Sequence, residues 1–165
     1  PIANLSATTN QNDTVPRYLT SGEWSPNATL ESLSNAMDVS KPNNWPRVET
    51  MLDRGDFDKH EFYSRSVSES RTQVVMKEIA ATGYVMEPHT AIALEGLTLD
   101  KAEDAVGICL ATAHPAKFKS SVEEVLEQEI AMPSVLQDAL DKKCLAEPMK
   151  ADYTQLKAAV FAKLL

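Results

Sequence analysis

The chain has 165 residues, 43% of them hydrophobic and 24% charged, a composition that fits one globular domain and excludes a disordered chain. Its net charge of −8 argues against a nucleic-acid or anionic-membrane partner, because both bind basic surfaces. No apolar run is long enough to span a bilayer and the two cysteines lie far apart in sequence, so we expect a reduced, cytoplasmic protein.

The first third of the chain predicts a strand followed by three helices. Apolar and small residues over 2–9 favour the strand, which ends in a polar turn. A short helix capped by Asp13 or Thr14 follows and stops at Gly22. Apolar residues at helical spacing predict further helices over 29–37 and from Asn44, and Gly55 is the expected C-cap of the second one.

The remaining two thirds predict more helices and one further strand. Residues 58–66 are polar and ambiguous. A helix over 70–81 should bury Val74, Val75 and Ile79. The other expected elements, in chain order, are an apolar helix over 90–97 opened by Glu87-Pro88-His89, a buried strand over 106–113, and helices over 115–129, 134–142 and 153–164, the last capped by Asp152.

The segment 107–118 is the most informative part of the sequence. A short apolar run ends at Thr112, and Pro115 then opens an amphipathic helix. Ligands of open α/β sheets bind where strand ends face helix N-termini, so Thr112 and His114 are candidate site residues. The alternative is ordinary turn chemistry, in which Thr112 ends the strand and His114 caps the helix.

A second polar group also follows a predicted strand. Asn10, Asn12 and Asp13 could share a cleft with Thr112, and Arg47 in an amide-rich loop could pair with a carboxylate or phosphate. Turn and capping chemistry is the alternative for all four. The three histidines, at 60, 89 and 114, have no metal-ligand spacing, and no nucleotide-binding glycine loop is present, so we expect no metal site.

Two observations predict that the chain is part of a longer protein. It begins at Pro1 without an initiator Met, and it enters a predicted strand at once. Two predicted strands are also too few for a stable parallel sheet that is covered on both faces.

Five blocks of the sequence resemble the bacterial threonine synthases, pyridoxal-phosphate (PLP) enzymes that make threonine from O-phosphohomoserine. The blocks occur in the family's order and are residues 7–17, 29–38, 42–47, 87–91 and 111–118. The resemblance implies the C-terminal portion of the tryptophan-synthase-like fold (fold type II), an α/β architecture with mostly helices around a few parallel strands. Residues 1–118 are then strongly family-like, and 119–165 form a helical tail.

The resemblance also implies a cofactor and roles for particular residues. Thr112 matches the hydroxyl residue that faces the pyridine nitrogen of PLP in this fold, and a neutral hydroxyl there makes the ring a moderate electron sink. Asn10, Asn12, Asp13 and Arg47 are candidates for shaping the end of the site that binds the substrate phosphate. The family's Schiff-base lysine and phosphate-binding loop have no counterpart in these 165 residues, so the chain alone should be inactive.

The sequence allows three interpretations of the function of this chain. The chain could belong to a related phospholyase, which would release a keto acid and ammonia, or it could be a cofactor-free interaction module. The third, preferred interpretation is threonine synthase. We also expect self-association, because apolar sheet surface is left without cover.

Overall fold

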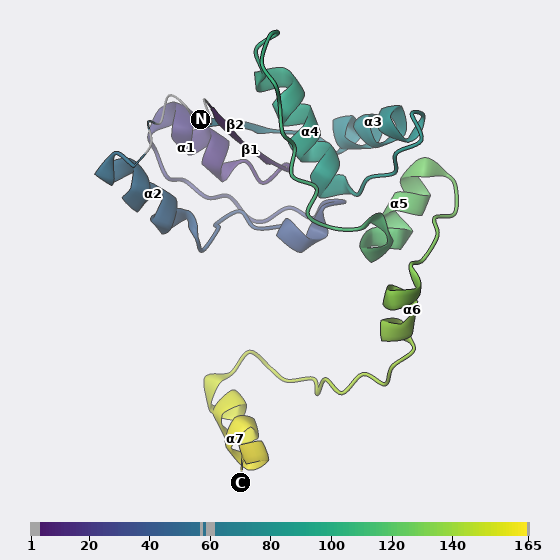
Figure 1. Ribbon diagram of the computed structural model, residues 1–165. Helices are drawn as coiled ribbons and strands as arrows, with labels where there is room; N and C mark the ends of the chain where they lie inside the picture. The colour runs from purple at the N-terminus through teal and green to yellow at the C-terminus, as the bar shows by residue number, and fades with distance from the viewer. Residues whose placement is uncertain (1–3, 57, 59–61, 165) are drawn as a thin grey trace. The chain divides into compact units, whose positions relative to one another are not determined.

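The computed structural model describes residues 4–56, 58 and 62–164. The chain divides into two compact units, residues 1–131 and 132–165, which we describe separately. Figure 1 follows the chain through both. In the first unit, two strands lie against a set of helices, so the predicted α/β class is confirmed.

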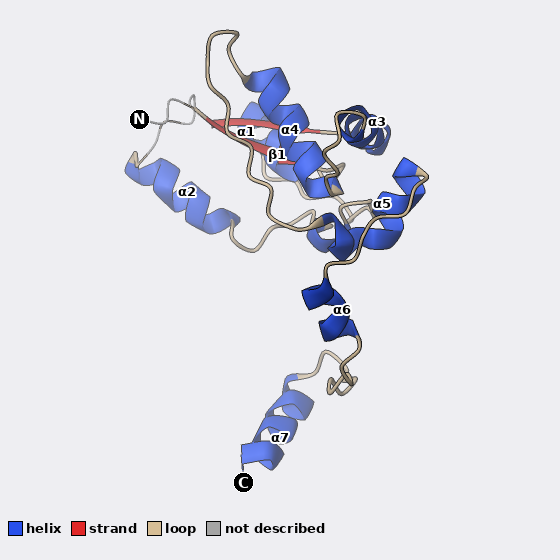
Figure 2. Ribbon diagram, turned by 45° about the vertical axis from the view of Figure 1, so that its right-hand side comes forward, coloured by secondary structure: helices blue, strands red, loops and turns tan. Residues whose placement is uncertain are grey.

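The sheet consists of two parallel strands, β1 (Leu5–Thr9) and β2 (Phe62–Ser66), shown in red in Figure 2. Their register pairs Leu5 with Phe62 and Thr9 with Ser66. β1 confirms the predicted strand over 5–9. Asn4 is not part of it, and positions 2 and 3 lie outside the described residues. β2 falls in the segment whose structure the sequence left open, because its polar residues show strand character only when they are paired with β1.

Two short helices and a single turn form the connection from β1 to β2. They are α1 (Thr14–Ser21), the 3₁₀ turn η1 (Asn35–Met37) and α2 (Trp45–Arg54). α2 ends as predicted at Gly55, whose φ of 72° is the left-handed conformation that favours glycine. The helix predicted over 29–37 is wrong, since only the last three of those residues are helical, as the short 3₁₀ turn η1.

Two helices pack against each other and one of them against the sheet. α3 (Glu69–Ala80) begins at Ser68, whose hydroxyl accepts a hydrogen bond from the Arg71 amide. α4 (Pro88–Asp100) lies between α3 and β1. α4 is longer than the predicted 90–97, because its N-terminus is capped by Glu87 and it continues to Asp100.

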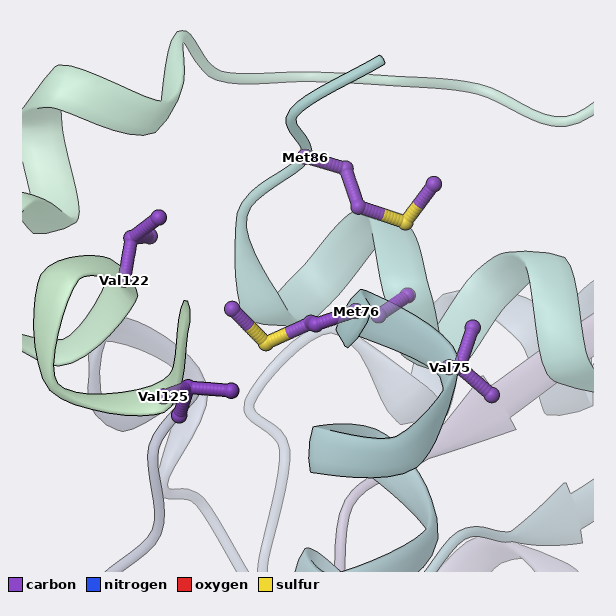
Figure 3. Close-up of a cluster of buried hydrophobic side chains, with 6 residues drawn as sticks. Val75, Met76, Met86, Val122 and Val125 are labelled. Atoms are coloured by element: carbon purple, nitrogen blue, oxygen red, sulfur yellow. The ribbon is translucent and has the colours of Figure 1, made fainter. Parts of the chain in front are cut away.

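The core of the first unit lies where α3, α4 and α5 meet. Figure 3 shows Met76 at the centre of a cluster of buried side chains, Val75, Met76, Met86, Ala91, Val122 and Val125. The prediction for α3 was right for Val75, while Ile79 packs partly buried against the cluster. It was wrong for Val74, which is 42% exposed, whereas Met76 is completely buried.

The predicted buried strand over 106–113 is not formed. These residues have no ladder partner, and Val106, Ile108 and Leu110 are 93%, 81% and 74% exposed. A strand needs a neighbour to pair its backbone N–H and C=O groups, and no described segment lies beside this one as a strand. The apolar run therefore has the composition of a buried strand without the contacts of one.

The helix predicted over 115–129 is present but divided. It consists of the 3₁₀ helix η3 (Pro115–Phe118) followed by α5 (Lys119–Leu126). Glu127 ends α5 with a φ of 55°. The predicted inner face is confirmed for Val122 and Val125, which are buried, and Phe118 and Leu126 pack partly buried against the core.

The second unit contains α6 (Ser134–Leu140) and α7 (Tyr153–Leu164). Asp152 caps α7 as predicted, and its carboxylate accepts a hydrogen bond from the Gln155 amide at 2.8 Å. Leu156, Val160 and Phe161 on the predicted apolar face of α7 are exposed. Across the described part of the chain, no helix combines the length and the apolarity that crossing a membrane requires.

Candidate functional site

Thr112 lies in the extended segment that precedes η3, and its side chain is exposed. Its hydroxyl makes no hydrogen bond with any residue of the described ranges 4–56, 58 and 62–164, so it is free to contact a ligand. The turn after it forms as the sequence predicts. His114 is the N-cap of η3 and its Nδ1 accepts a hydrogen bond from the Ala116 amide at 3.1 Å, while Pro115 occupies the first position.

The first turn of α4 lies close to this segment and carries a buried carboxylate. Glu87 is fully buried and accepts four hydrogen bonds, from the amides of His89 and Thr90 at 2.7 Å each, from the Thr90 hydroxyl at 2.6 Å and from His89 Nδ1 at 2.5 Å. Burial alone would raise the pKa of Glu87. The hydrogen bonds from His89 and Thr90 outweigh it and hold this pKa below its ordinary value.

Two side chains from the Thr112 segment contact the same turn. The ring of Phe118 lies 4.9 Å from that of His89, centroid to centroid, at an interplanar angle of 53°. The thiol of Cys109 lies 3.9 Å from the Thr90 carbonyl oxygen. Burial, and then the Glu87 carboxylate, raise the pKa of that thiol. Both cysteines are free.

Asn10 and Asn12 lie directly after β1, and both are buried. The side-chain nitrogen of Asn10 donates hydrogen bonds to oxygen atoms of the 30–38 loop. The side-chain oxygen of Asn10 accepts hydrogen bonds from the backbone and side-chain amides of Asn12 at 3.0 Å each. Asn12 in turn holds Leu30, donating to its carbonyl at 2.9 Å and accepting from its amide at 2.8 Å. The two amides therefore attach the 30–38 loop to the carboxyl end of β1.

Asp38 completes this network from the other side of the loop. Its carboxylate accepts hydrogen bonds from Asn10 at 3.0 Å and from the Ser32 hydroxyl and amide at 2.5 and 2.8 Å. Ser34 contributes a further acceptor for Asn10 at 2.9 Å. These polar contacts replace the helix that was predicted over 29–37, because side chains that bond the local backbone compete with helix formation.

The remaining two predicted site residues lie apart from this network. Asp13 pairs with Arg17, Oδ1 to Nε, at 3.0 Å across one turn of α1. Arg47 lies on α2 with its side chain exposed, and its guanidinium makes no hydrogen bond or ion pair within the described ranges. Thr112 and Arg47 are thus free to bind a ligand, whereas Asn10, Asn12 and Asp13 already have protein partners.

Sequence reasoning missed two features of the site region. The buried Glu87 and its bonds to His89 depend on tertiary packing, although Glu87-Pro88 is a recognisable helix start. The Ser32, Ser34 and Asp38 network lay inside a pattern interpreted as helix. An open cleft of about 690 Å³ lies between α1 and α2, and none of the five predicted site residues lines it.

Comparisons with known proteins agree on one family. A family model described as "Threonine synthase, C-terminal" matches residues 90–160. The threonine synthases of Serratia marcescens and Haemophilus influenzae are each 46% identical to this chain, over 95% and 96% of it. The chain spans about 37% of the length of each of these relatives.

Solved structures extend the agreement to the fold. The crystal structure of threonine synthase from Escherichia coli superimposes with a TM-score of 0.91 at 42% identity, covering 99% of this chain and 38% of that one. The PLP-bound threonine synthase from Brucella melitensis has a TM-score of 0.76 at 25% identity, covering 87% of this chain and 36% of that one. The predicted fold type II, α/β architecture is thereby confirmed. The chain belongs to the threonine synthase family and corresponds to its C-terminal part.

Proposed function

We propose that the protein carrying this chain is a cytoplasmic, PLP-dependent threonine synthase, which converts O-phosphohomoserine and water into L-threonine and phosphate. The observation that carries the proposal is the 41–46% identity to six curated threonine synthases over at least 95% of the chain. PLP is the cofactor in this proposal because the Brucella melitensis relative is PLP-bound. The division into a family-like part, 1–118, and a tail, 119–165, belongs to the same proposal.

Thr112 fits the contact that the cofactor ring would need. Its exposed hydroxyl has no partner within the described ranges, and a hydroxyl can donate a hydrogen bond to a pyridine nitrogen. PLP supplies an electron sink when it is bound, and the group opposite its ring nitrogen sets how strongly it withdraws electrons. In this proposal Thr112 holds that nitrogen without fixing a proton on it.

The four polar residues of the substrate end act in two ways in this proposal. Arg47 has a free, exposed guanidinium and contacts the substrate phosphate directly. Asn10 and Asn12 are saturated with protein hydrogen bonds and act by holding the 30–38 loop. Asp13 orients Arg17 at the start of α1.

A chimera tests this function. The corresponding C-terminal part of the Escherichia coli threonine synthase is replaced by these 165 residues, and phosphate and threonine are measured after O-phosphohomoserine is added. We expect equal amounts of both products. The 165-residue chain alone should release neither, because by resemblance the cofactor lysine lies outside it.

The position of Thr112 is tested in the same chimera. Thr112→Val removes the hydroxyl at nearly constant volume and should lower the turnover rate about tenfold, the effect of losing one hydrogen bond. Thr112→Ser keeps the hydroxyl and should stay close to the unsubstituted chimera. Release of a keto acid and ammonia in place of threonine, or a folded chimera that does not bind PLP, would contradict the proposed function.

A further inference from the structure

The Glu87 side chain does more than cap a helix. An N-cap needs one or two acceptors for the free amides of the first turn, and a short exposed side chain suffices. Glu87 is fully buried, and besides the two amides it bonds His89 Nδ1 at 2.5 Å. Because the carboxylate can only accept, His89 Nδ1 carries the proton of this bond, and the orientation of the imidazole is fixed by it.

The oriented imidazole is one of two contacts that hold the segment containing Thr112. Phe118, after Thr112 in the chain, lies against the His89 ring at 4.9 Å. Cys109, before Thr112, lies against the Thr90 carbonyl. His89 and Thr90 are the two residues whose backbone and side chains Glu87 bonds.

The backbone of the segment has few other contacts of its own. Within the described ranges, no backbone hydrogen bond joins residues 106–113 to a neighbouring strand. Gly107 lies close to α4, where an added Cβ would be 3.0 Å from side-chain atoms of Leu97 and Lys101. Figures 1 and 2 both show the segment passing along α4. Among the described residues, its position therefore depends on side-chain contacts with that helix.

We infer that Glu87 and His89 form a positioning pair that sets the location of Thr112 by holding both ends of the 109–118 segment on the first turn of α4. The inference rests on the proposed function for the role of Thr112, but not for the contacts themselves. His89 Nε2 is buried without a partner within the described ranges, so the ring is held from its Nδ1 side and by its tilted contact with the Phe118 ring.

The first experiment uses the 165-residue chain without cofactor, diluted until light scattering shows a monomer, because self-association through residues 106–110 would cover Cys109. The rate at which Cys109 reacts with iodoacetamide is measured, and the exposed Cys144 is the internal reference. His89→Ala leaves the charge of Glu87 in place, so a faster reaction reports lost burial of the Cys109 thiol and not a changed charge beside it. We expect the reaction rate of Cys109, relative to that of Cys144, to rise about tenfold. Hydrogen exchange in η3 should also become faster, because local opening exposes the Cys109 thiol and the η3 amides alike.

Glu87→Gln and Glu87→Asp extend this test. Gln places an N–H donor where His89 Nδ1 needs an acceptor, so the segment should loosen as it does in His89→Ala. Asp keeps the charge and is itself a favoured N-cap, so it should stay near the unsubstituted rate. Unchanged Cys109 reactivity and hydrogen exchange in both His89→Ala and Glu87→Gln would overturn the inference.

A matched control separates positioning from stability. Glu95 is a buried carboxylate on α4, but its partner is Arg71 on α3, Oε1 to Nε, at 2.8 Å. In the chimera, Glu87→Gln and His89→Ala should each weaken PLP binding about tenfold and shift the absorption band of bound PLP, as the loss of one fixed contact would. Glu95→Gln should lower the melting temperature and leave both PLP readouts unchanged.

The outcomes distinguish the two proposals. If Glu87→Gln and Glu95→Gln weaken PLP binding equally and in proportion to their melting temperatures, the Glu87 and His89 pair is merely structural and the inference is wrong. If the unsubstituted chimera folds without binding PLP, the proposed function fails. The Cys109 measurement still decides whether the pair holds the segment.

Discussion

At the scale of single residues, one buried amide organises the connection between β1 and the helices. Asn10 lies where β1 ends, and its side chain contacts three acceptors, Ser32, Ser34 and Asp38, within 3.0 Å. Its oxygen meanwhile accepts from Asn12. A buried polar group with all its hydrogen bonds made is tolerated, but one left unpaired is costly.

Asn10→Asp tests the importance of this amide. The change keeps the shape of the side chain but places a carboxylate oxygen beside the Asp38 carboxylate, where the amide nitrogen now lies at 3.0 Å. We expect the free energy of unfolding at pH 7 to fall by about 1–3 kcal/mol, the cost of a broken buried hydrogen bond. Urea unfolding followed by tryptophan fluorescence measures it.

Asn27→Asp is the matched control for that substitution. Asn27 is exposed and makes no hydrogen bond within the described ranges, so the same change of charge should have little effect there. An unfolding free energy that is equal for the two variants would show that the Asn10 network does not stabilise the fold.

At the scale of elements, α4 approaches β1 closely at Gly96. A Cβ added at Gly96 would lie 1.7 Å from Thr8 Oγ1 and 2.9 Å from Thr8 Cβ, so only glycine lets the helix approach the strand. Glycine inside a helix is normally unfavourable by about 0.5–1 kcal/mol relative to alanine. The contact with Thr8 therefore reverses the usual preference.

Gly96→Ala gives a result whose sign separates these two effects. Helix propensity alone predicts a more stable protein, whereas the contact with Thr8 predicts a loss of about 1–3 kcal/mol from overpacking. We expect the loss, seen as a lower melting temperature by circular dichroism. Thr98→Ala on the exposed side of the same helix is the control and should change the melting temperature little.

The elements also show which structural features can be predicted from local sequence. Gly55 and Asp152 mark helix ends correctly, because a cap depends on residues within one turn. β2 and the 30–38 loop could not be found this way. Their structure depends on pairing with β1 and on bonds to Asn10, which lie far away in the sequence.

At the scale of the whole molecule, the exposed apolar run over 106–110 is the feature that needs explanation. Its large side chains, Val106, Ile108 and Leu110, are exposed, and the smaller Gly107 and Cys109 alternate with them. The chain spans about 37% of the length of its relatives in Serratia marcescens and Haemophilus influenzae. An unpaired apolar strand is a template for pairing with another chain.

We therefore expect the 165-residue chain by itself to self-associate through this run. Light scattering after gel filtration should show dimers or larger species, and Ile108→Lys should reduce them, because a charge on the strand opposes pairing. Leu99→Lys changes another exposed apolar residue, on α4, and should leave association unchanged. A monomer at high concentration, or equal effects of the two lysines, would contradict this expectation.

The sequence by itself determined the helices with local caps, the α/β class, the first strand and the family, because propensity, capping residues and characteristic blocks are local. Only the tertiary structure decided the second strand, the burial of Glu87 against His89 and the packing of Gly96 on Thr8. It also showed that residues 106–113 are exposed and unpaired, although their composition is that of a buried strand. The physical reason is that strand pairing and burial are properties of neighbours, which a local pattern does not specify.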